Sequence, residues 1–155
     1  MPEFQPAQDL RAFACEILDL SKSVWASQST DKPPVDLTET EFLALDTLSR
    51  AEHPLNVGDI QREIRVAPAQ MSRILRSLES KGEKLVECKL NHDDKRRIDV
   101  ELTPSGREVH QKYRQVKLAT IQKMLDGFTV EERNQFMILL RKIRDNLHKS
   151  TQRSS

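Results

Sequence analysis

One face of the segment APAQMSRILRSLESKG, residues 67–82, carries side chains suited to binding a polyanion. On a helix drawn through the segment this face is small, hydroxylated and basic, with no acidic member: Ala69, Ser72, Arg73, Arg76 and Ser80. The opposite face has the i, i+3, i+4, i+7 stripe that a helix turns toward a core: Met71, Ile74, Leu75 and Leu78. Because arginine binds O6 and N7 of guanine bidentately, and serine bonds a base or a phosphate, the segment predicts a helix that contacts nucleic acid.

The first turn of this expected helix has no ordinary cap. Ala67 stands where an N-cap side chain would be and Pro68 takes the first helical position, so no nearby side chain satisfies the free backbone N–H groups. A phosphate can satisfy them, and the small Ala69 allows its close approach; water is the alternative partner. The candidate DNA contacts of the helix are therefore Pro68, Ala69, Gln70, Ser72, Arg73 and Arg76.

A second basic cluster lies in NHDDKRR, residues 91–97. The flanking residues alternate apolar and polar types, which predicts a β-hairpin with a charged tip and with these side chains inward: Val86, Cys88, Leu90, Ile98, Val100 and Leu102. Lys95, Arg96 and Arg97 on such a tip can reach a minor groove, where a narrow groove concentrates negative potential. Asp94 is placed to pair with Arg96 and aim it. The alternative is a solvated, charged turn.

Helices before and after these segments are expected to hold them in place. Thr38 with Glu41, and Thr129 with Glu132, form capping boxes that start two of them, and Thr103 caps a third. The expected helices span residues 9–28, 38–51, 57–64, 67–82, 104–127 and 129–149.

The first and last of these helices have apolar stripes that need partners. One seam of the first helix repeats with steps of 3 and 4: Leu10, Phe13, Ile17, Leu20 and Val24. A second stripe on it holds Ala14, Leu18 and Trp25. Such a helix is either central in its own core or held between its own domain and a second subunit. The last helix has an expected inward stripe of Phe136, Leu140, Ile143 and Leu147.

The order of the elements is that of a winged helix-turn-helix. Two short helices joined by the tight turn at residues 65–67 form a helix-turn-helix, and a two-stranded ribbon directly behind it forms a wing. In such units the second helix enters the DNA major groove with its N-terminal residues against base edges. The expected fold is mainly α with a small β wing.

Composition narrows the classes of protein that fit. The 155 residues suffice for one compact domain, and Cys15 and Cys88 form no C-x-x-C pattern, which fits a reducing cytoplasm. The longest apolar run, residues 136–140, is too short for a membrane span, and the N-terminus lacks a signal-peptide core. We expect a cytoplasmic protein that needs no cofactor and no membrane.

The net charge of +1 hides an uneven distribution. Residues 1–57 hold 4 basic and 10 acidic side chains (net −6), residues 58–97 hold 10 and 7 (net +3), and residues 98–155 hold 11 and 7 (net +4). A polyanion therefore prefers the middle and later parts of the chain.

These features together resemble the MarR (multiple antibiotic resistance regulator) family over residues 9–149. The resemblance rests on the order of the elements, on APAQMSRILRSLESKG and on DKRRIDVELTPSG at residues 94–106. Its most specific part is the D-x-R…L-T-x-x-G pattern, matched by Asp94, Arg96, Leu102, Thr103 and Gly106.

The resemblance implies a homodimeric repressor that binds a pseudo-palindromic, double-stranded operator and is released by a small aromatic or anionic effector. It also implies one MarR-like domain over residues 1–155, with a DNA-binding lobe at 37–103 and dimerisation helices at 9–28 and 104–149.

Two features depart from the family pattern. The segment KGEKLVE inserts Glu83 and Lys84 where the family usually passes from K-G directly to L-V-E, which we expect to lengthen the first wing strand or shift its angle. Pro68 and Ala69 replace the more usual Ser and Thr, which leaves fewer hydroxyls for phosphates.

Two other functions stay open as alternatives. A winged helix can bind a protein, although such modules usually lack a basic recognition face and a basic wing tip. A redox sensor is the other, because some members of the family sense peroxides through a cysteine in the first helix, where Cys15 lies. Its flanking residues do not match that branch, and Glu16 disfavours a thiolate, so we interpret Cys15 as a small apolar residue and Cys88 as packing.

No pattern predicts an enzyme or a metal site. His53, His92, His110 and His148 show no i, i+4 pairing. The sequence also has no nucleophile elbow, no glycine loop for phosphates and no paired-carboxylate signature.

Overall fold

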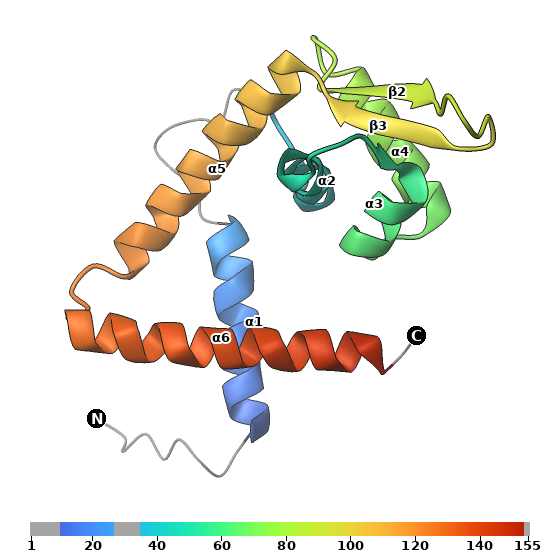
Figure 1. The fold of residues 1–155 in the computed structure, drawn as a ribbon. Helices are drawn as coiled ribbons and strands as arrows, with labels where there is room; N and C mark the ends of the chain where they lie inside the picture. Colours follow the sequence, from blue (N-terminus) through green and yellow to red (C-terminus); the bar gives the residue numbers. More distant parts are fainter. Residues whose placement is uncertain (1–9, 27–34, 154–155) are drawn as a thin grey trace. The chain divides into compact units, whose positions relative to one another are not determined.

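The computed structural model describes residues 10–26 and 35–153. Its helices are α1 (Leu10–Ala26), α2 (Glu39–Arg50), α3 (Val57–Ile64), α4 (Pro68–Glu79), α5 (Pro104–Met124) and α6 (Val130–Gln152). Its strands are β1 (Leu55–Asn56), β2 (Val86–Leu90) and β3 (Ile98–Leu102). The prediction of a mainly α fold with a small β wing is confirmed, and Figure 1 shows the short helices grouped beside the wing. The expected N-terminal segment and most of the loop at 29–36 lie outside the described residues.

Both predicted capping boxes are present. Thr38 Oγ1 accepts the Glu41 N–H at 3.2 Å, and the Glu41 carboxylate accepts the Thr38 N–H at 2.8 Å. Thr129 and Glu132 repeat this arrangement at the start of α6. Each box satisfies two N–H groups that a helix start leaves free, so residues three apart in the sequence determine where these helices begin.

An apolar core lies between α2, α3, α4 and the base of the wing. Its fully buried large side chains are Leu45, Ile60, Met71, Leu78, Leu85, Val86 and Val100. The predicted stripe on α4 is buried throughout, with Met71 and Leu78 at 0%, Ile74 at 5% and Leu75 at 8% exposure. Because this stripe anchors α4, its opposite face points outward.

The wing has one strand more than expected. In the described part of the chain the strands form one antiparallel sheet in the order β1-β3-β2. The predicted hairpin is present as β2 and β3, and β1 adds a third strand that was not predicted from the sequence. Leu55 pairs with Val100 and Asn56 with Asp99. A strand of two residues is too short for an alternating pattern, and only its pairing with β3 makes it a strand.

The expected inward alternation holds at the base of the wing but not at its tip. Val86 and Val100 are fully buried, and Cys88 and Leu102 are half-buried. Leu90 and Ile98, which pair with each other nearest the tip, are 67% and 44% exposed. The hairpin extends beyond the core there, so the two side chains pair with each other but are not covered by the core.

The start of α5 is bound tightly to the base of the wing. Thr103 Oγ1 accepts the Gly106 N–H at 3.0 Å and donates to the backbone oxygen of Lys84, while the Thr103 N–H donates to Leu85 O at 3.1 Å. Glu83 accepts a hydrogen bond from Ser105. The inserted residues therefore contact the start of α5, and they do not lengthen β2, which begins at Val86.

Replacing Gly106 with alanine should destabilise the protein. A Cβ at this position would lie 1.8 Å from the backbone oxygen of Leu85, which cannot move without displacing β2. We expect the free energy of unfolding in urea to fall by about 1–3 kcal/mol or more, as in other overpacked sites. Gly58→Ala is the control, because its nearest atom is a side-chain oxygen at 3.2 Å. Unchanged urea midpoints for Gly106→Ala would contradict the close approach.

Two helix ends differ from expectation. We expected the recognition helix to end at Gly82, but α4 ends at Glu79 with Ser80 as its C-cap, and Gly82 takes its left-handed conformation (φ 61°) in the loop beyond. The last helix, predicted to end at residue 149, continues as α6 through Gln152.

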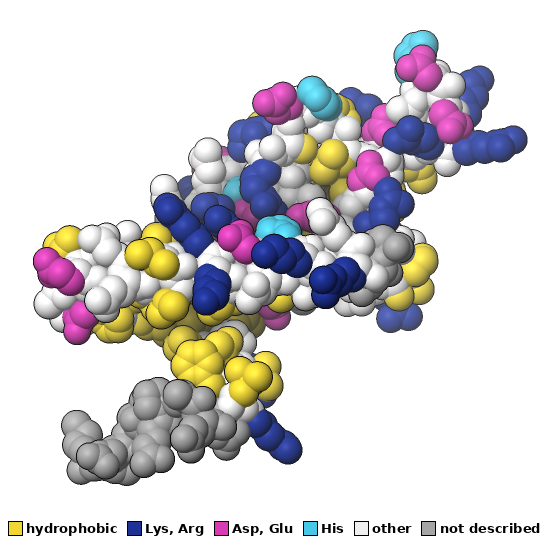
Figure 2. Space-filling model, turned by 60° about the horizontal axis from the view of Figure 1, so that its bottom comes forward, with side chains coloured by type: hydrophobic (Ala, Val, Ile, Leu, Met, Phe, Trp, Pro, Cys, Tyr) yellow, Lys and Arg dark blue, Asp and Glu magenta, His cyan; other side chains and the backbone are white. Residues whose placement is uncertain are grey.

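Residues 1–120 and 121–155 form two compact units. In the first unit, α1 has no buried residue, and its exposed apolar side chains are Leu10, Phe13, Ile17, Leu18 and Leu20. In the second, α6 has none either, so its expected inward stripe is exposed in the single chain, at 39–59% for Phe136, Leu140, Ile143 and Leu147. Figure 2 shows hydrophobic side chains at the surface of both helices. The single MarR-like domain stays a prediction.

Candidate nucleic-acid interface

The outward face of α4 carries the predicted DNA contacts. Each of these side chains is exposed: Pro68, Ala69, Gln70, Ser72, Arg73 and Arg76. Arg73 makes no hydrogen bond or ion pair with any described residue, whereas Arg76 Nε lies 3.3 Å from Ser72 O. Ser72 Oγ bonds Pro68 O at 3.2 Å. The Arg73 side chain is therefore available to bind a ligand. The Arg76 side chain lies along the helix and is held by a weak contact at the limit of hydrogen-bond length.

The N-terminus of α4 has the uncapped geometry that its sequence indicates. Ala67 is extended (φ −71°, ψ 154°) and supplies no side-chain hydrogen bond, and Pro68 takes the first turn. The free N–H groups and the positive end of the helix dipole therefore face outward together.

The turn before α4 depends on a residue that the sequence did not single out. Arg65 closes α3 in the left-handed conformation (φ 56°, ψ 51°), and its N–H donates to Gln61 O. Glycine is the usual residue in that conformation, so no local sequence signal marks it. This residue sets the sharp change of direction between the two helices of the motif.

A buried ion pair holds the far end of α4. Glu41, 4% exposed, lies with its Oε2 3.2 Å from Lys81 Nζ, and Lys81 also donates to Asp36 O at 2.8 Å. Burial alone would raise the pKa of Glu41, but hydrogen bonds from Ser77, the Thr38 backbone and Lys81 outweigh it and lower the pKa. The capping residue of α2 thus also fixes the end of the recognition helix, a role that spacing alone does not reveal.

Hydrogen bonds to Asn91 and Asp94 organise the wing tip. Asn91 Oδ1 accepts the N–H groups of Asp93 and Asp94 at 2.9 Å each, and the Arg97 N–H donates to Asp94 O at 2.9 Å. Lys95, Arg96 and Arg97 are all exposed on this turn. Figure 2 shows Lys and Arg side chains projecting from the end of the hairpin beside acidic and histidine side chains.

Asp94 orients the wing in a different way from the one expected. Its Oδ1 accepts the backbone N–H of Arg96 at 3.0 Å, and among the described residues it forms no ion pair with the Arg96 guanidinium. The prediction that Asp94 pairs with the Arg96 side chain is therefore wrong. Aspartate commonly bonds the backbone two residues on, which shapes a turn, so Asp94 places the Cα of Arg96 and leaves its side chain free.

An aromatic cluster joins α1, α2 and α5 within the first unit. Phe42 lies 5.2 Å from Tyr113 and 6.2 Å from Trp25, ring centre to ring centre. Lys117 Nζ lies 4.5 Å from the centre of the Trp25 ring and donates to Trp25 O at 2.7 Å. Burial lowers the pKa of Lys117, partly offset by Glu39. Sequence periodicity placed Trp25 on an apolar stripe but did not bring the lysine to the rings.

The two cysteines have different surroundings. Cys15 is exposed in the single chain, so the interpretation of it as a buried apolar residue does not hold there. Cys88 is half-buried, and burial, followed by the charge of Glu79, raises its pKa to about 11. A thiol so rarely ionised at neutral pH is a poor nucleophile, which agrees with a packing role for Cys88.

The raised pKa of Cys88 predicts an unusual alkylation profile. In a Cys15→Ser variant, the rate of reaction with iodoacetamide should rise about tenfold per pH unit up to about pH 10, because the thiolate fraction keeps increasing below the pKa. Circular dichroism over the same range controls for unfolding. A rate that levels off near pH 9 would show that the thiol of Cys88 is unperturbed.

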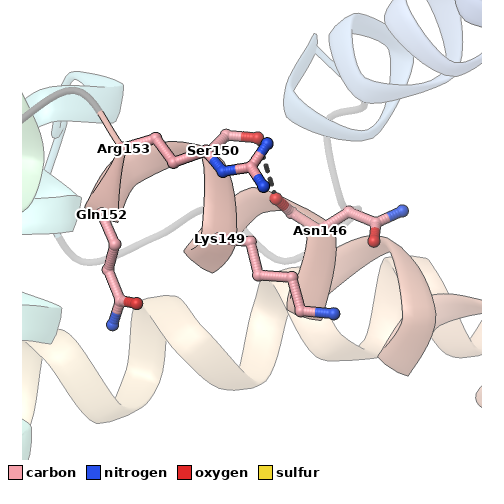
Figure 3. A pocket seen from close by; sticks show the side chains of 5 residues that line it. All are labelled: Asn146, Lys149, Ser150, Gln152 and Arg153. Carbon is pink, nitrogen blue, oxygen red and sulfur yellow. Dashed lines mark hydrogen bonds between the residues drawn. The ribbon is translucent and has the colours of Figure 1, made fainter.

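We assign no function to the other candidate features, which are metal sites, membrane spans and a hollow on α6. Within residues 10–26 and 35–153, no three His, Cys, Asp or Glu side chains are grouped to hold a metal ion. In the same ranges, no helix is long and apolar enough to cross a membrane. A hollow on α6 is lined by Asn146, Lys149, Ser150, Gln152 and Arg153. Figure 3 shows Gln152 and Lys149 extending from separate points of the helix with their polar ends well apart, so the polar groups of the hollow do not converge on one centre.

Comparison with known proteins gives a consistent set of relatives. Residues 37–98 match the model of the MarR family. The uncharacterized HTH-type transcriptional regulator YdgJ of Bacillus subtilis (strain 168) is 30% identical over 106 residues, 68% of this chain. The match spans 63% of the length of that relative.

Solved structures agree in fold. A MarR/EmrR family transcriptional regulator from Acinetobacter sp. ADP1 is 26% identical, with a TM-score of 0.67 over 90% of this chain and 96% of that one. A structure on the regulation of DNA binding of Bordetella bronchiseptica BpsR by 6-hydroxynicotinic acid is 20% identical, with a TM-score of 0.64 over 86% and 96%. The matches confirm the resemblance and the winged-helix fold, and the proteins named are regulators, not enzymes.

Proposed function

Because residues 37–98 match the MarR family, which the motifs of the whole chain resemble, we propose that this protein is a sequence-specific regulator of transcription that binds double-stranded DNA. The observation that carries the proposal is the exposed basic face of α4, opposite a fully anchored apolar stripe. α4 is the second helix of a helix-turn-helix, the element that enters the major groove. A protein-binding winged helix would have no use for such a face.

Each part of this surface has a role in the proposal. Arg73 and Arg76 read guanine bases. The free N–H groups of the first turn, with Pro68, Ala69, Gln70 and Ser72 beside them, lie against a phosphate and the adjoining base edges. Lys95, Arg96 and Arg97 place the wing over a neighbouring minor groove.

The active form in this proposal is a homodimer. The exposed apolar stripes of α1 and α6 are the surfaces that a second copy covers. A two-fold dimer presents two recognition helices, which explains why the expected operator is an inverted repeat.

The proposal includes repression, because a dimer bound across a promoter blocks polymerase without further contacts. It also includes relief of this repression by a small molecule. BpsR, whose fold this chain shares, has its DNA binding regulated by an aromatic acid. We leave the contacts of such a ligand in this chain unassigned, because Tyr113 is buried and Lys117 already lies over the Trp25 ring. We place this regulator in the cytoplasm, with the promoter that it binds.

Selection of bound fragments from random duplex DNA tests the proposal. An enriched inverted repeat is the expected result, because a symmetric dimer selects a symmetric site. Recovery of no sequence above the starting pool, at low and at moderate salt, would reject sequence-specific binding.

Substitutions in the wing should separate its contact residue from its shaping residue. Arg96→Ala should weaken operator binding by about 1.5–3 kcal/mol, the scale of a hydrogen bond to a charged group, and most where the flanks are A·T-rich. Asp94→Ala should also weaken binding, because the Arg96 N–H loses its acceptor and the turn loosens. Titrations at several salt concentrations measure both effects.

Asp94→Asn is the matched control, because it keeps an oxygen acceptor and removes the charge. Simple electrostatics predicts that every loss of an acid beside phosphates tightens binding. Tighter binding by Asp94→Ala would contradict the shaping role, and unchanged binding by Arg96→Ala would remove the wing from the interface.

A further inference from the structure

Asp46, on α2, contacts two side chains of α5 at once. Its Oδ1 accepts a hydrogen bond from His110 Nε2 at 2.9 Å and lies 3.1 Å from Arg114 Nη1. Its Oδ2 lies 3.3 Å from Nη2 of Arg50, on its own helix. The side chains of Asp46 and His110 are only 16% and 6% exposed, so the surrounding water competes little for these bonds.

The two α5 partners lie one helical turn apart. His110 and Arg114 are at i and i+4 and therefore on the same face of α5. A single carboxylate thus contacts α5 at two points one helical turn apart. These contacts fix the rotation of α5 about its own axis and the position of α5 along α2. The His110 ring is further confined by stacking on Phe42, with centres 5.6 Å apart and planes at 17°.

The neighbouring apolar contacts cannot by themselves fix the rotation and position of α5. Phe42, Tyr113 and Trp25 bury area between α1, α2 and α5, but burial of apolar surface is non-directional and tolerates sliding. Hydrogen bonds to a carboxylate are directional and weaken steeply when misaligned. The bonds of Thr103 hold the start of α5 to the wing, and Tyr113 Oη donates to Leu37 O at 3.3 Å, just before α2. We assign to Asp46 the angle at which the middle of α5 crosses α2.

That angle matters because α5 leads out of the DNA-binding lobe. It runs as one helix from the wing at Pro104 to Met124, and so connects the lobe to residues 121–155. In a dimer the two recognition helices must be separated by one helical turn of DNA or a multiple of it, each turn 10–10.5 base pairs. We propose that Asp46 is the residue that sets the operator half-site spacing this protein accepts, an inference that rests on the function proposed above.

Three substitutions test this proposal. Asp46→Asn removes the charge and one strong acceptor while keeping the size of the side chain. Arg114→Met removes one link to α5 from a half-exposed position, so the variant is expected to fold. Arg50→Met is the matched control, because Arg50 pairs with the same carboxylate but lies on α2 and, within the described part of the chain, makes no link to α5.

The measurement compares the selected operator with versions whose spacer is one or two base pairs shorter or longer. The parent and Arg50→Met should prefer the selected spacing by about tenfold or more, the scale of a mismatched position. For Asp46→Asn and Arg114→Met this preference should shrink to about threefold or less. Affinity for a duplex with one intact and one scrambled half-site should stay unchanged, because the recognition surface of each lobe is untouched.

Two results would overturn the proposal. Undiminished spacing preference in Asp46→Asn and Arg114→Met would show that contacts other than those of Asp46 set the angle. If Asp46→Asn lost as much affinity for the half-site duplex as for the full operator, Asp46 would only stabilise the lobe. Failure of the parent to prefer any duplex would instead reject the proposed function, and it would be seen before any variant is compared.

Discussion

Replacing Arg73 with alanine is expected to weaken operator binding by about 2–6 kcal/mol per dimer. A bidentate arginine–guanine contact contributes about 1–3 kcal/mol of discrimination, and a symmetric dimer loses one contact in each half-site. Arg73 is exposed on the outward face of α4 and has no protein partner among the described residues, so its loss leaves the fold intact. Arg76→Ala should act in the same direction.

The form of the loss distinguishes base reading from phosphate contact. If these arginines read guanine, the substitution should also relax the preference at one base position in each half-site. Equal weakening on all duplexes, with a shallower salt dependence, would reassign the residue to a phosphate. Arg133→Ala, an exposed arginine on α6, is the control for lost positive charge. Unchanged binding by both α4 variants would contradict α4 as the recognition helix.

Placing a charge in the seam of α1 should dissociate the dimer. Ile17 is 44% exposed in the single chain, so Ile17→Asp leaves the fold of one chain undisturbed. In the proposed dimer the same carboxylate would be buried without a partner, which costs several kcal/mol. We expect monomers at micromolar concentration by analytical ultracentrifugation. Loss of the second half-site should then weaken operator binding by about 10²-fold or more.

Ser23→Asp is the matched control, because it adds the same charge to the same helix on its polar side. Removal of residues 1–28 should likewise give a monomeric or aggregating chain. A dimer that persists in Ile17→Asp and in the truncated chain would exclude α1 from the interface. Wild-type affinity with a monomeric Ile17→Asp would instead show that one lobe is sufficient for binding.

Much of the candidate interface follows from short stretches of sequence. The capping boxes, the apolar stripe of α4 and the uncapped start at Ala67 depend on residues within four positions of one another. Hydrogen bonds and side-chain contacts inside one helix turn are local, so the sequence alone identifies them. The same locality made Arg73 and Arg76 recognisable as members of an outward face.

The predictions from sequence failed where the position of a side chain depends on a partner far away in the chain, or where the expected partner is missing. Leu90 and Ile98 alternate correctly, yet the hairpin extends past the core that would cover them. The stripe of α6 was predicted to face inward, and that of α1 to face either its own core or a second subunit, because amphipathicity shows that a face needs a cover and not which chain supplies it. Asp94 has the right spacing to Arg96, but spacing does not decide between a backbone N–H and a guanidinium.

The sequence by itself therefore determined the helices, the hairpin and the basic face of α4, because each is encoded in neighbouring residues. Only the tertiary structure decided that β1 exists, that Gly106 must be glycine, and that Asp46 meets α5. His110 lies 64 positions from Asp46 along the chain, and neither residue type signals the other. Contacts between residues so far apart in the sequence form only once apolar burial has brought their helices together. No local sequence pattern therefore predicts them.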